Sequence, residues 1–238
     1  MKKHYLFAFH KNILSFLPKP VKKYEIGEEI GIPFDSSGFS KIQFNTTTDR
    51  KLEFIVIENK ADTDSIKLIS KNIITSLAYD AAEPDNTIAN NISLSGNSRW
   101  DLSNIRQWLN SDGAADSWFT PQHEFDTAPS YVSDPGFLTG FSSETKQHFV
   151  TSTISTSVPN IYNIHSVNTN DIFYLPLYGD IPSNYLSINA DSSYFTRFMS
   201  GMFQVSNIYY IDKNGKQSAG IGIAAKEVLG IRPIISIK

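Results

Sequence analysis

The segment from Ser98 to Asn110 constrains the fold most, because it is a short helix signature in a chain otherwise typical of strands. Four apolar residues recur in it at helical spacing and form one stripe: Leu102, Ile105, Trp108 and Leu109. We expect Asp101 to cap this helix, and Asn110 and Gly113 to end it. Trp100 and Trp108 are then predicted to be packing residues of the core rather than parts of a binding site.

Three arginines are predicted to stabilise the fold. Arg106 lies off the apolar stripe, where it can reach a nearby carboxylate. Arg197 and Arg232 are each flanked by apolar residues, and a buried arginine must be paired. Backbone carbonyls, or acids such as Asp101 and Asp171, are the expected partners, and contact with a ligand is the alternative interpretation.

Two patterns predict β-hairpins. Apolar residues alternate over 51–58 and 65–70, on either side of a polar turn, as expected for paired strands. A strand over 206–212 is followed by Asn214-Gly215, a pair that favours a type I′ turn.

The rest of the chain gives weaker signals of regular structure. Strands are expected over 171–177, where Pro176 ends the strand or places it at a sheet edge, and over 228–237 as one buried closing strand. A second short helix is expected over 143–149, capped by Ser142. Three segments are polar and are predicted to be irregular: 80–98, 111–136 and 151–170.

Composition limits the class of protein. The chain of 238 residues is 40% hydrophobic and 19% charged, which is typical of a globular domain. Its net charge of −3 gives no electrostatic reason to expect a nucleic-acid partner. It has no cysteine, so disulfides, thiolate metal sites and cysteine nucleophiles are excluded. We expect no membrane insertion, since no segment has the apolar length that a spanning helix needs.

Residues 1–24 are predicted to form an N-terminal arm, followed by a single domain over 25–238. The apolar run after Lys2 and Lys3 is interrupted early, so we expect no cleaved signal peptide. The arm contains large apolar residues that would not stay exposed alone, among them Phe7, Phe9, Leu14 and Phe16. It either packs on its own domain or docks on a neighbouring chain as an assembly device.

Two long loops contain the candidate ligand-binding residues. They are Trp118, Phe119, His123 and Tyr131 in the loop 111–136, and Tyr178 and Tyr185 in the loop 178–192. Long loops without secondary structure are often functional, and exposed aromatic rings can stack on carbohydrate or contact protein. The alternative is that each ring packs beneath its own loop.

No catalytic or metal-binding motif is present in the sequence. Glu83-Pro84-Asp85-Asn86, with Trp100-Asp101 further on, resembles the calcium ligands of sugar-binding lectins, but lies too early in the chain, and a polar turn is the alternative. The histidines show no zinc-binding spacing, and neither a nucleophile elbow nor a phosphate loop occurs. We therefore expect a non-enzymatic protein with neither a cofactor nor a metal.

Five motif-like segments follow one another within residues 30–238. They are Trp100, Ser103, Ile105, Arg106, Trp108, Leu109 and Asn110, in the pattern W-x-x-S-x-I-R-x-W-L-N; Pro135-Gly136-Phe137-Leu138 with Phe141; Asp171, Phe173 and Leu175; Tyr194-Phe195-Thr196-Arg197; and Gly215 followed by Gly230-Ile231-Arg232-Pro233. In this order they resemble an uncharacterised domain family of bacterial surface proteins, phages and prophages. Where that family has paired tryptophans, this chain has Tyr194-Phe195.

The resemblance implies a fold and a function. That family is similar to C-type-lectin-like domains and to formylglycine-generating enzymes, so we expect an α+β fold of small antiparallel sheets, two short helices and long irregular loops. The activity of those enzymes needs cysteines and does not carry over. The resemblance implies a virion protein, of the tail or associated with the capsid, or a bacterial surface protein. Its partners would be other assembly proteins and a host glycan or protein receptor, and we expect a homo-oligomer. A structural subunit that binds its neighbours through the arm is the alternative.

Overall fold

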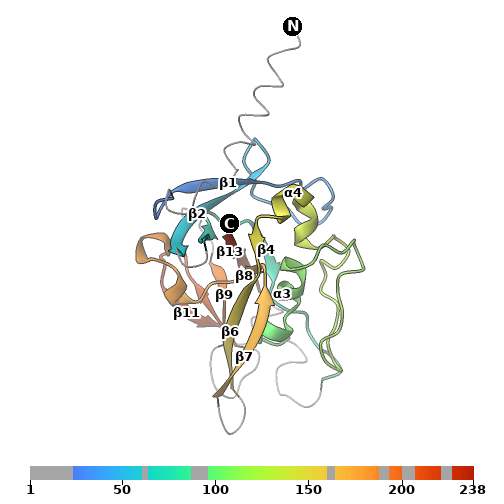
Figure 1. Ribbon diagram of the computed structural model, residues 1–238. Helices are drawn as coiled ribbons and strands as arrows, with labels where there is room; N and C mark the ends of the chain where they lie inside the picture. Colours follow the sequence, from blue (N-terminus) through green and yellow to red (C-terminus); the bar gives the residue numbers. More distant parts are fainter. Residues whose placement is uncertain are drawn as a thin grey trace.

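The computed structural model describes residues 24–60, 64–86, 96–159, 164–187, 193–199, 207–220 and 227–238. These residues form a predominantly β-structure with two short α-helices (Figure 1), which is compatible with the expected α+β class. The arm residues Phe7, Phe9, Leu14 and Phe16 lie outside the described part, so the arm stays a prediction.

The first sheet contains six strands and includes the C-terminal strand at its centre. Its strands are β1 (Glu29–Pro33), β2 (Lys51–Lys60), β3 (Ser65–Ser70), β13 (Ile234–Ile237) and β5 (Phe149–Val150), in that order, with β8 (Phe173–Tyr174) also paired to β13. All of these pairs are antiparallel. The predicted hairpin over 51–58 and 65–70 is confirmed as β2–β3, with a register shift between Val56 and Glu58.

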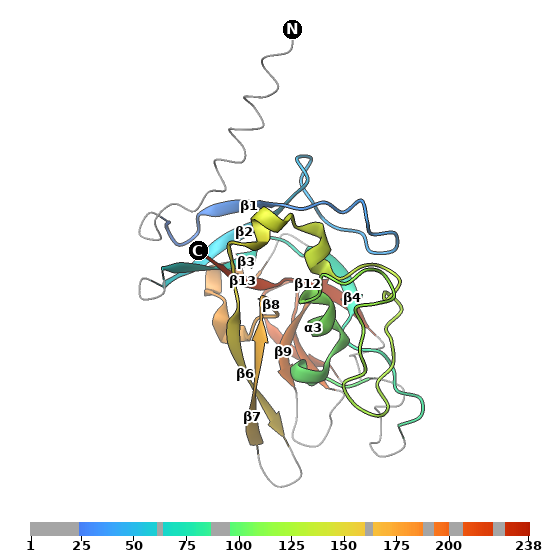
Figure 2. The same ribbon diagram turned by 45° about the vertical axis from the view of Figure 1, so that its right-hand side comes forward.

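The second sheet has five strands and lies beside the first (Figure 2). Its order is β11 (Gln217–Gly220), β10 (Ile208–Ile211), β9 (Tyr194–Met199), β12 (Val228–Ile231) and β4 (Thr75–Ala78). The pairing of β12 with β9 is parallel, whereas the other pairs in this sheet are antiparallel.

The segment 228–237 was predicted as one strand, and that prediction is wrong. The chain makes two strands, β12 in the second sheet and β13 in the first, separated by Arg232 and Pro233. Pro233 has no amide hydrogen to donate to a ladder, so the strand is interrupted there and the chain passes from one sheet to the other.

The hairpin β10–β11 is confirmed, but its turn is not of type I′. That turn needs a positive φ at both central residues, and among the described residues only Gly215 of the pair has one, at +78°. The N–H of Gly215 donates to the carbonyl of Asp212, and the Asp212 carboxylate accepts from the amides of Asn214 and Lys216. The aspartate therefore organises a longer turn.

The segment 151–170 was predicted to be irregular, and this is also wrong. It forms a two-stranded antiparallel ribbon of β6 (Ser152–Pro159) and β7 (Ile164–Asp171). Ile154, Thr156 and Val158 alternate as buried residues along β6, so the ribbon has the two-residue period of a strand despite its turn-like composition. The predicted strand 171–177 is correspondingly reduced to β8.

Two short helices pack beside these sheets. They are α3 (Asn104–Leu109) and α4 (Ser143–Lys146), and four 3₁₀ turns accompany them: Trp100–Leu102, Phe137–Gly140, Tyr178–Asp180 and Ser183–Tyr185. The side chain of Ser142 accepts from the Thr145 amide, which confirms the predicted cap, and α4 ends before Phe149 because that residue enters β5. Within the described residues, every helix is too short to cross a membrane.

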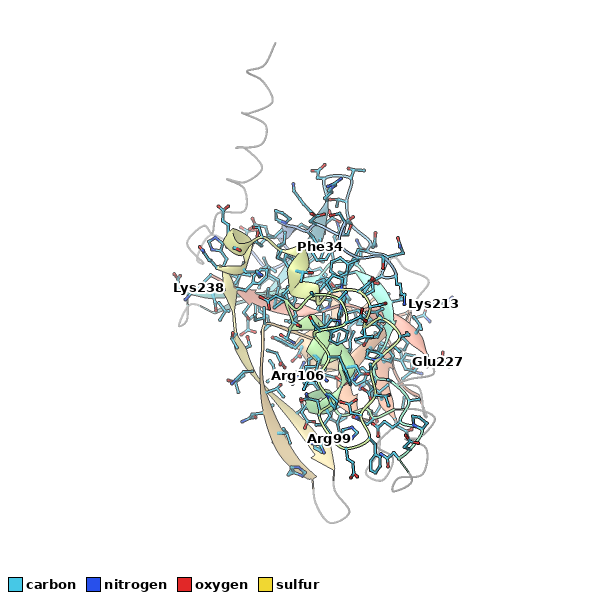
Figure 3. The ribbon with its side chains drawn as sticks, turned by 90° about the vertical axis from the view of Figure 1, so that its right-hand side faces the viewer. Phe34, Arg99, Arg106, Lys213, Glu227 and Lys238 are labelled. Carbon is cyan, nitrogen blue, oxygen red and sulfur yellow. The ribbon has the colours of Figure 1, made fainter. Side chains whose placement is uncertain are left out.

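An aromatic cluster fills the space between α3, α4 and the first sheet. Its rings contact one another with centroids 4.7–6.2 Å apart and belong to Phe34, Phe39, Phe44, Trp108, Phe137, Phe141, Phe149 and Phe173. Phe34, labelled in Figure 3, follows β1 and packs on Phe137 and Phe141. Trp108 of this cluster contacts the loop 111–136, edge-on to the Tyr131 ring and by a hydrogen bond from its Nε1 to the Pro135 carbonyl.

Candidate functional site

One buried carboxylate, that of Asp171, joins the motif Trp100–Asn110 to the end of β7. Its Oδ2 accepts from Trp100 Nε1 at 2.8 Å and from Thr169 Oγ1 at 2.6 Å, and its Oδ1 accepts from Arg106 Nε at 2.7 Å. Trp100 and Trp108 are fully buried. The structure confirms the packing role predicted for both tryptophans and the pairing of Arg106 (Figure 3) with an acid.

The cap of α3 is Ser103, so the prediction that Asp101 caps this helix is wrong. Ser103 has the extended backbone that an N-cap needs, and its hydroxyl accepts from the Arg106 amide at 3.4 Å. Asp101 instead lies in the preceding 3₁₀ turn and pairs with Arg99 at 2.5 Å. The extra turn shifts the start of the helix by two residues.

Asn110 ends α3, as predicted, and also clamps β8. Its Nδ2 donates to the carbonyls of Arg106 and Phe173, while its Oδ1 accepts from the amides of Ile172 and Phe173. The side-chain amide thus replaces a strand neighbour for two residues. Ser103, Arg106 and Asn110 each hold the fold together, so the motif belongs to the core and is not a binding site.

Arg197 is buried and paired, as predicted. Its Nη1 donates to the carbonyl of Leu175 and to Oδ2 of Asp180, both at 2.6 Å, and its guanidinium lies over the ring of Tyr174. The acid is Asp180 rather than Asp101 or Asp171, because the 3₁₀ turn Tyr178–Asp180 brings that carboxylate against β9.

Arg232 is fully buried and binds backbone carbonyls. Its guanidinium donates to the carbonyls of Ser70 and Tyr185, at 2.9 and 2.5 Å, and contacts the hydroxyl of Tyr194 at 3.1 Å. Burial lowers its pKa from the usual value. Both Arg197 and Arg232 therefore connect sheet to loop, which supports the structural interpretation of these residues.

The loop 111–136 contains no helix or strand, as predicted, but two of its candidate ligand-binding rings face inward. Trp118 is 6% exposed and Tyr131 is 4% exposed, and they stack with centroids 5.8 Å apart. Trp118 Nε1 donates to the Asp134 carbonyl, and the Tyr131 hydroxyl donates to the Ala78 carbonyl. These two rings therefore follow the alternative interpretation and pack beneath their own loop, with their polar atoms bound to backbone carbonyls.

Asp134 anchors the end of this loop to the segment after β1. Its two carboxylate oxygens accept from the amides of Ser40, Lys41 and Ile42 and from the Ser40 hydroxyl, at 2.5–3.1 Å. Burial opposes the ionisation of Asp134, but these hydrogen bonds together outweigh it and lower the pKa of the carboxyl group. The loop is thus pinned by a buried anion.

Asp80 anchors the segment that leads into α3, as Asp134 anchors the loop. Its carboxylate is fully buried and accepts from the amides of Asn97 and Asn104, at 2.8 and 3.0 Å. Burial raises the pKa of Asp80 well above its ordinary value. Asn104 in turn donates to Asp126 of the loop at 3.2 Å, so the two segments are connected.

The calcium-like motif does not form a ligand set. Glu83 is buried, and its carboxylate contacts Asn86 Nδ2 at 2.6 Å, Asn97 Nδ2 at 3.3 Å and His123 Nε2 at 3.2 Å, whereas Asp85 is exposed. In the described ranges, no three His, Asp or Glu side chains are grouped so that they could hold a metal ion. Glu83 therefore belongs to a polar turn, and His123 ties the loop to it.

The outer side of the loop 111–136 remains open to solvent. Its exposed residues are small or polar: Asp112, Ala114, Ala115, Asp116, Ser117, Thr120, Pro121, Gln122, Glu124, Ala128 and Ser130. Phe119 is half-buried, with its ring edge-on to Trp118 at 6.4 Å. The loop is 26 residues long, and its outer surface is mainly polar. It does not present an aromatic platform.

The second candidate loop lies elsewhere on the molecule. Tyr178 is 38% exposed, and Tyr185 is half-buried against the core. Figure 1 shows the turns at 178–187 (orange) and the loop 111–136 (green to yellow) on opposite sides of the sheets. The structure therefore does not combine the two loops into one site. Residues 188–192 of the predicted loop lie outside the described part.

A shallow groove of about 450 Å³ borders β4. It is lined by residues 41–43, Asn45 and residues 73–77, with both polar and apolar side chains. Two of its lining residues are joined by a hydrogen bond from the Asn45 amide to the Ile74 carbonyl. Its lining contains Lys41 but, within the described residues, no set of convergent acids or bases.

Comparisons with protein family models, with curated proteins and with solved structures find no match to this chain. The function must therefore be argued from the geometry of the molecule. Sequence reasoning missed Asp80 and Asp134, whose carboxylates fix the loop and the segment beside it, and it considered Glu83 only as part of a calcium-like motif or a polar turn. Asp134 lies between Ser133 and Pro135 in a turn-forming stretch, whereas Asp80 lies between Tyr79 and Ala81, and neither context separates a buried acid from a solvated one.

Proposed function

We propose that this chain is a non-enzymatic binding domain that presents the outer side of the loop 111–136 to a partner. The observation that carries the proposal is the anchoring of this loop. A segment of this length normally has a functional reason when it lacks regular structure. Here it is fixed by the Trp118–Tyr131 stack and by Asp134, while eleven outward side chains make no part of the core.

A fixed loop is suited to binding because little conformational entropy is lost when a partner docks. Three inner contacts hold the loop at separate points along its length: Trp118 with Asp134, Asp126 with Asn104, and His123 with Glu83. The mainly polar outer surface, with small side chains, fits a partner that offers hydrogen bonds, such as a host glycan or the polar surface of a receptor protein.

The family resemblance described above supports a proposal for the kind of protein in which this binding domain acts. It favours a C-type-lectin-like arrangement, in which irregular chain is displayed on one side of small sheets. The two short helices and the long loop beside them are compatible with that arrangement. We propose a phage or prophage virion protein, or a bacterial surface protein, acting in adhesion.

The test is binding of the purified full-length chain, fluorescently labelled, to a glycan array and to a panel of bacterial cells. The variant Ala115→Arg/Ala128→Arg places two bulky cations on the outer side of the loop, where both alanines are exposed. Ala219→Arg, at the exposed position of β11, is the control. We expect the loop variant to lose binding at least about tenfold, in line with truncation effects at binding hot spots, and the control to bind as the wild type does.

Two results would contradict the proposal. Equal binding of the wild type and the loop variant would assign recognition to another surface. Binding to neither the array nor any cell type, by a chain shown to be folded, would remove the adhesion function itself.

A further inference from the structure

The ribbon β6–β7 is a sheet of its own, separate from the two larger sheets. Eight residue pairs join its strands in an unbroken antiparallel register, from Ser152 with Asp171 to Pro159 with Ile164. Figure 2 shows the ribbon running along the body, with its far end extending beyond the other strands. Isolated two-stranded ribbons are marginally stable, so this one needs further contacts.

One side of the ribbon packs on the body. Ile154, Thr156 and Val158 of β6 and Thr169 of β7 are buried, and β6 lies against β9. The opposite side is exposed and consists of hydroxyl and amide side chains. Cross-strand pairs such as Thr153 with Asn170 and Ser155 with Asn168 make up this polar row.

The ribbon sequence has no charge. Charged residues make up 19% of the chain, yet no Asp, Glu, Lys or Arg occurs from Thr151 to Asn170. Exposed polar surfaces of soluble proteins usually contain charges of both signs, and lysine in particular keeps strand edges apart. The exposed side of the ribbon lacks that protection.

The unprotected edge is that of β7. Among the described residues, β7 pairs only with β6, and His165, Ser166, Asn168 and Asn170 are exposed along it. The strand has no bulge and no proline, the other devices that prevent edge pairing. Alternate backbone N–H and C=O groups on this edge are therefore free to pair with another strand.

Two other sheet edges in the described part, those of β1 and β4, are protected. The edge strand β1 contains a proline, Pro33, and a charged residue, Glu29, which forms an ion pair with Lys71. At the β4 edge, the Asn45 amide donates a hydrogen bond to the Ile74 carbonyl, and the Tyr131 hydroxyl donates one to the Ala78 carbonyl. These two carbonyls are therefore not available to another strand. The edge of β7 differs from these two in having neither a charged residue before Asp171 nor a proline, and it is longer than β11, the four-residue edge strand of the second sheet.

We propose that β7 pairs with β7 of a second copy of this chain, antiparallel about a two-fold axis. One strand edge is complementary to itself in the antiparallel direction, so the contact closes as a dimer and does not continue into a fibre. Because the strand has no charged residue before Asp171, the two copies meet without opposing like charges. The pairing extends each two-stranded ribbon into a four-stranded sheet, which supplies the stability that the isolated ribbon lacks.

The test is the oligomeric state of the full-length chain, measured by sedimentation across a concentration range. The variant Ser166→Lys/Asn168→Lys puts two cations on β7, where both side chains are exposed. Ala115→Lys/Ala128→Lys adds the same charge on the loop 111–136 and is the matched control. We expect a wild-type dimer, a control dimer, and an edge variant whose dissociation constant is raised about tenfold or more.

Hydrogen exchange of the wild type gives a second measurement that needs no variant. Peptides covering 164–171 should become more protected as the protein concentration rises, while peptides from β1 should not change. The proposal is overturned by a monomeric wild type, by a dimer that the edge lysines leave intact, or by association without protection of β7. A dimer abolished only by deletion of residues 1–23 would assign the interface to the arm and overturn it as well.

Discussion

Arg106 and Asp171 are 65 positions apart in the sequence, yet the guanidinium Nε of the first donates to the carboxylate of the second at 2.7 Å. Asp171 has no exposed side-chain surface, and it also binds the indole of Trp100. This single carboxylate therefore fixes α3 against the ribbon β6–β7, so that the helix, the ribbon and the loop that follows the helix are positioned together.

Replacing Asp171 by Ala should be strongly destabilising. The change leaves the buried Trp100 indole and the Arg106 guanidinium without their acceptor, and loss of one partner of a buried pair costs about 3–5 kcal/mol in the free energy of unfolding. Urea denaturation measures this. Asp101→Ala is the control, because its pair with Arg99 joins near neighbours at a partly exposed position and should cost about 1 kcal/mol or less. Similar losses in both variants would contradict the anchoring role of Asp171.

Asp134→Asn should destabilise the protein in a pH-dependent way. The folded-state pKa of Asp134 is lowered, so its contribution is fully present above the unfolded value of about 4 and is lost as pH falls through the folded value. The amide would also turn a donor toward the amides of residues 40–42. We expect a loss of about 2 kcal/mol at pH 7, typical of hydrogen bonds to a charged group, shrinking as the solution is acidified.

Asp112→Asn is the control for this experiment, because Asp112 is an exposed acid at the start of the same loop. Its unfolding free energy should follow that of the wild type at every pH. If the difference in the free energy of unfolding between the wild type and Asp134→Asn stayed constant down to acid pH, Asp134 would not stabilise the fold as an ionised carboxylate.

Part of this fold could be predicted from local sequence. The hairpin β2–β3 and the Ser142 cap depend on short-range periodicity and on one side chain bonding to a neighbouring amide, and both were predicted. The ribbon β6–β7 was missed because its Ser, Thr and Asn residues have the composition of turns, although the buried Ile154 and Val158 keep a strand period. The division of 228–237 into β12 and β13 depends on long-range pairing with strands of two different sheets. The sequence of this segment alone does not show which sheet each half joins.

The candidate site was less predictable than the fold. A sequence shows that Trp118 and Tyr131 lie in a loop, but not on which side of it. Their burial is decided by partners 16 and 53 positions away, Asp134 and Ala78. The anchoring acids Asp80 and Asp134 are likewise defined only by the backbone amides that the fold brings to them.

Trp118→Ala should loosen the loop 111–136 and not merely alter its surface. The change removes the stack on Tyr131 and the hydrogen bond to the Asp134 carbonyl, and large-to-small changes of buried tryptophan cost about 3–5 kcal/mol. Hydrogen exchange should rise across 111–136, whereas Phe119→Ala, at a half-buried ring, should have a smaller effect. A Trp118→Ala variant with wild-type stability and exchange would restore this residue as a ligand contact.

Asn110→Asp tests whether the side-chain amide clamps β8 through both of its groups. The aspartate keeps an oxygen that can accept from the amides of Ile172 and Phe173, but it replaces the Nδ2 donor by an oxygen facing the carbonyls of Arg106 and Phe173. Two acceptors then oppose each other at a partly buried position, and we expect a loss of about 1–3 kcal/mol in the free energy of unfolding. The loss should become smaller at acid pH, because protonation of the new carboxyl group restores one donor. An Asn110→Asp variant as stable as the wild type at pH 7 would show that only the acceptor half of the clamp matters.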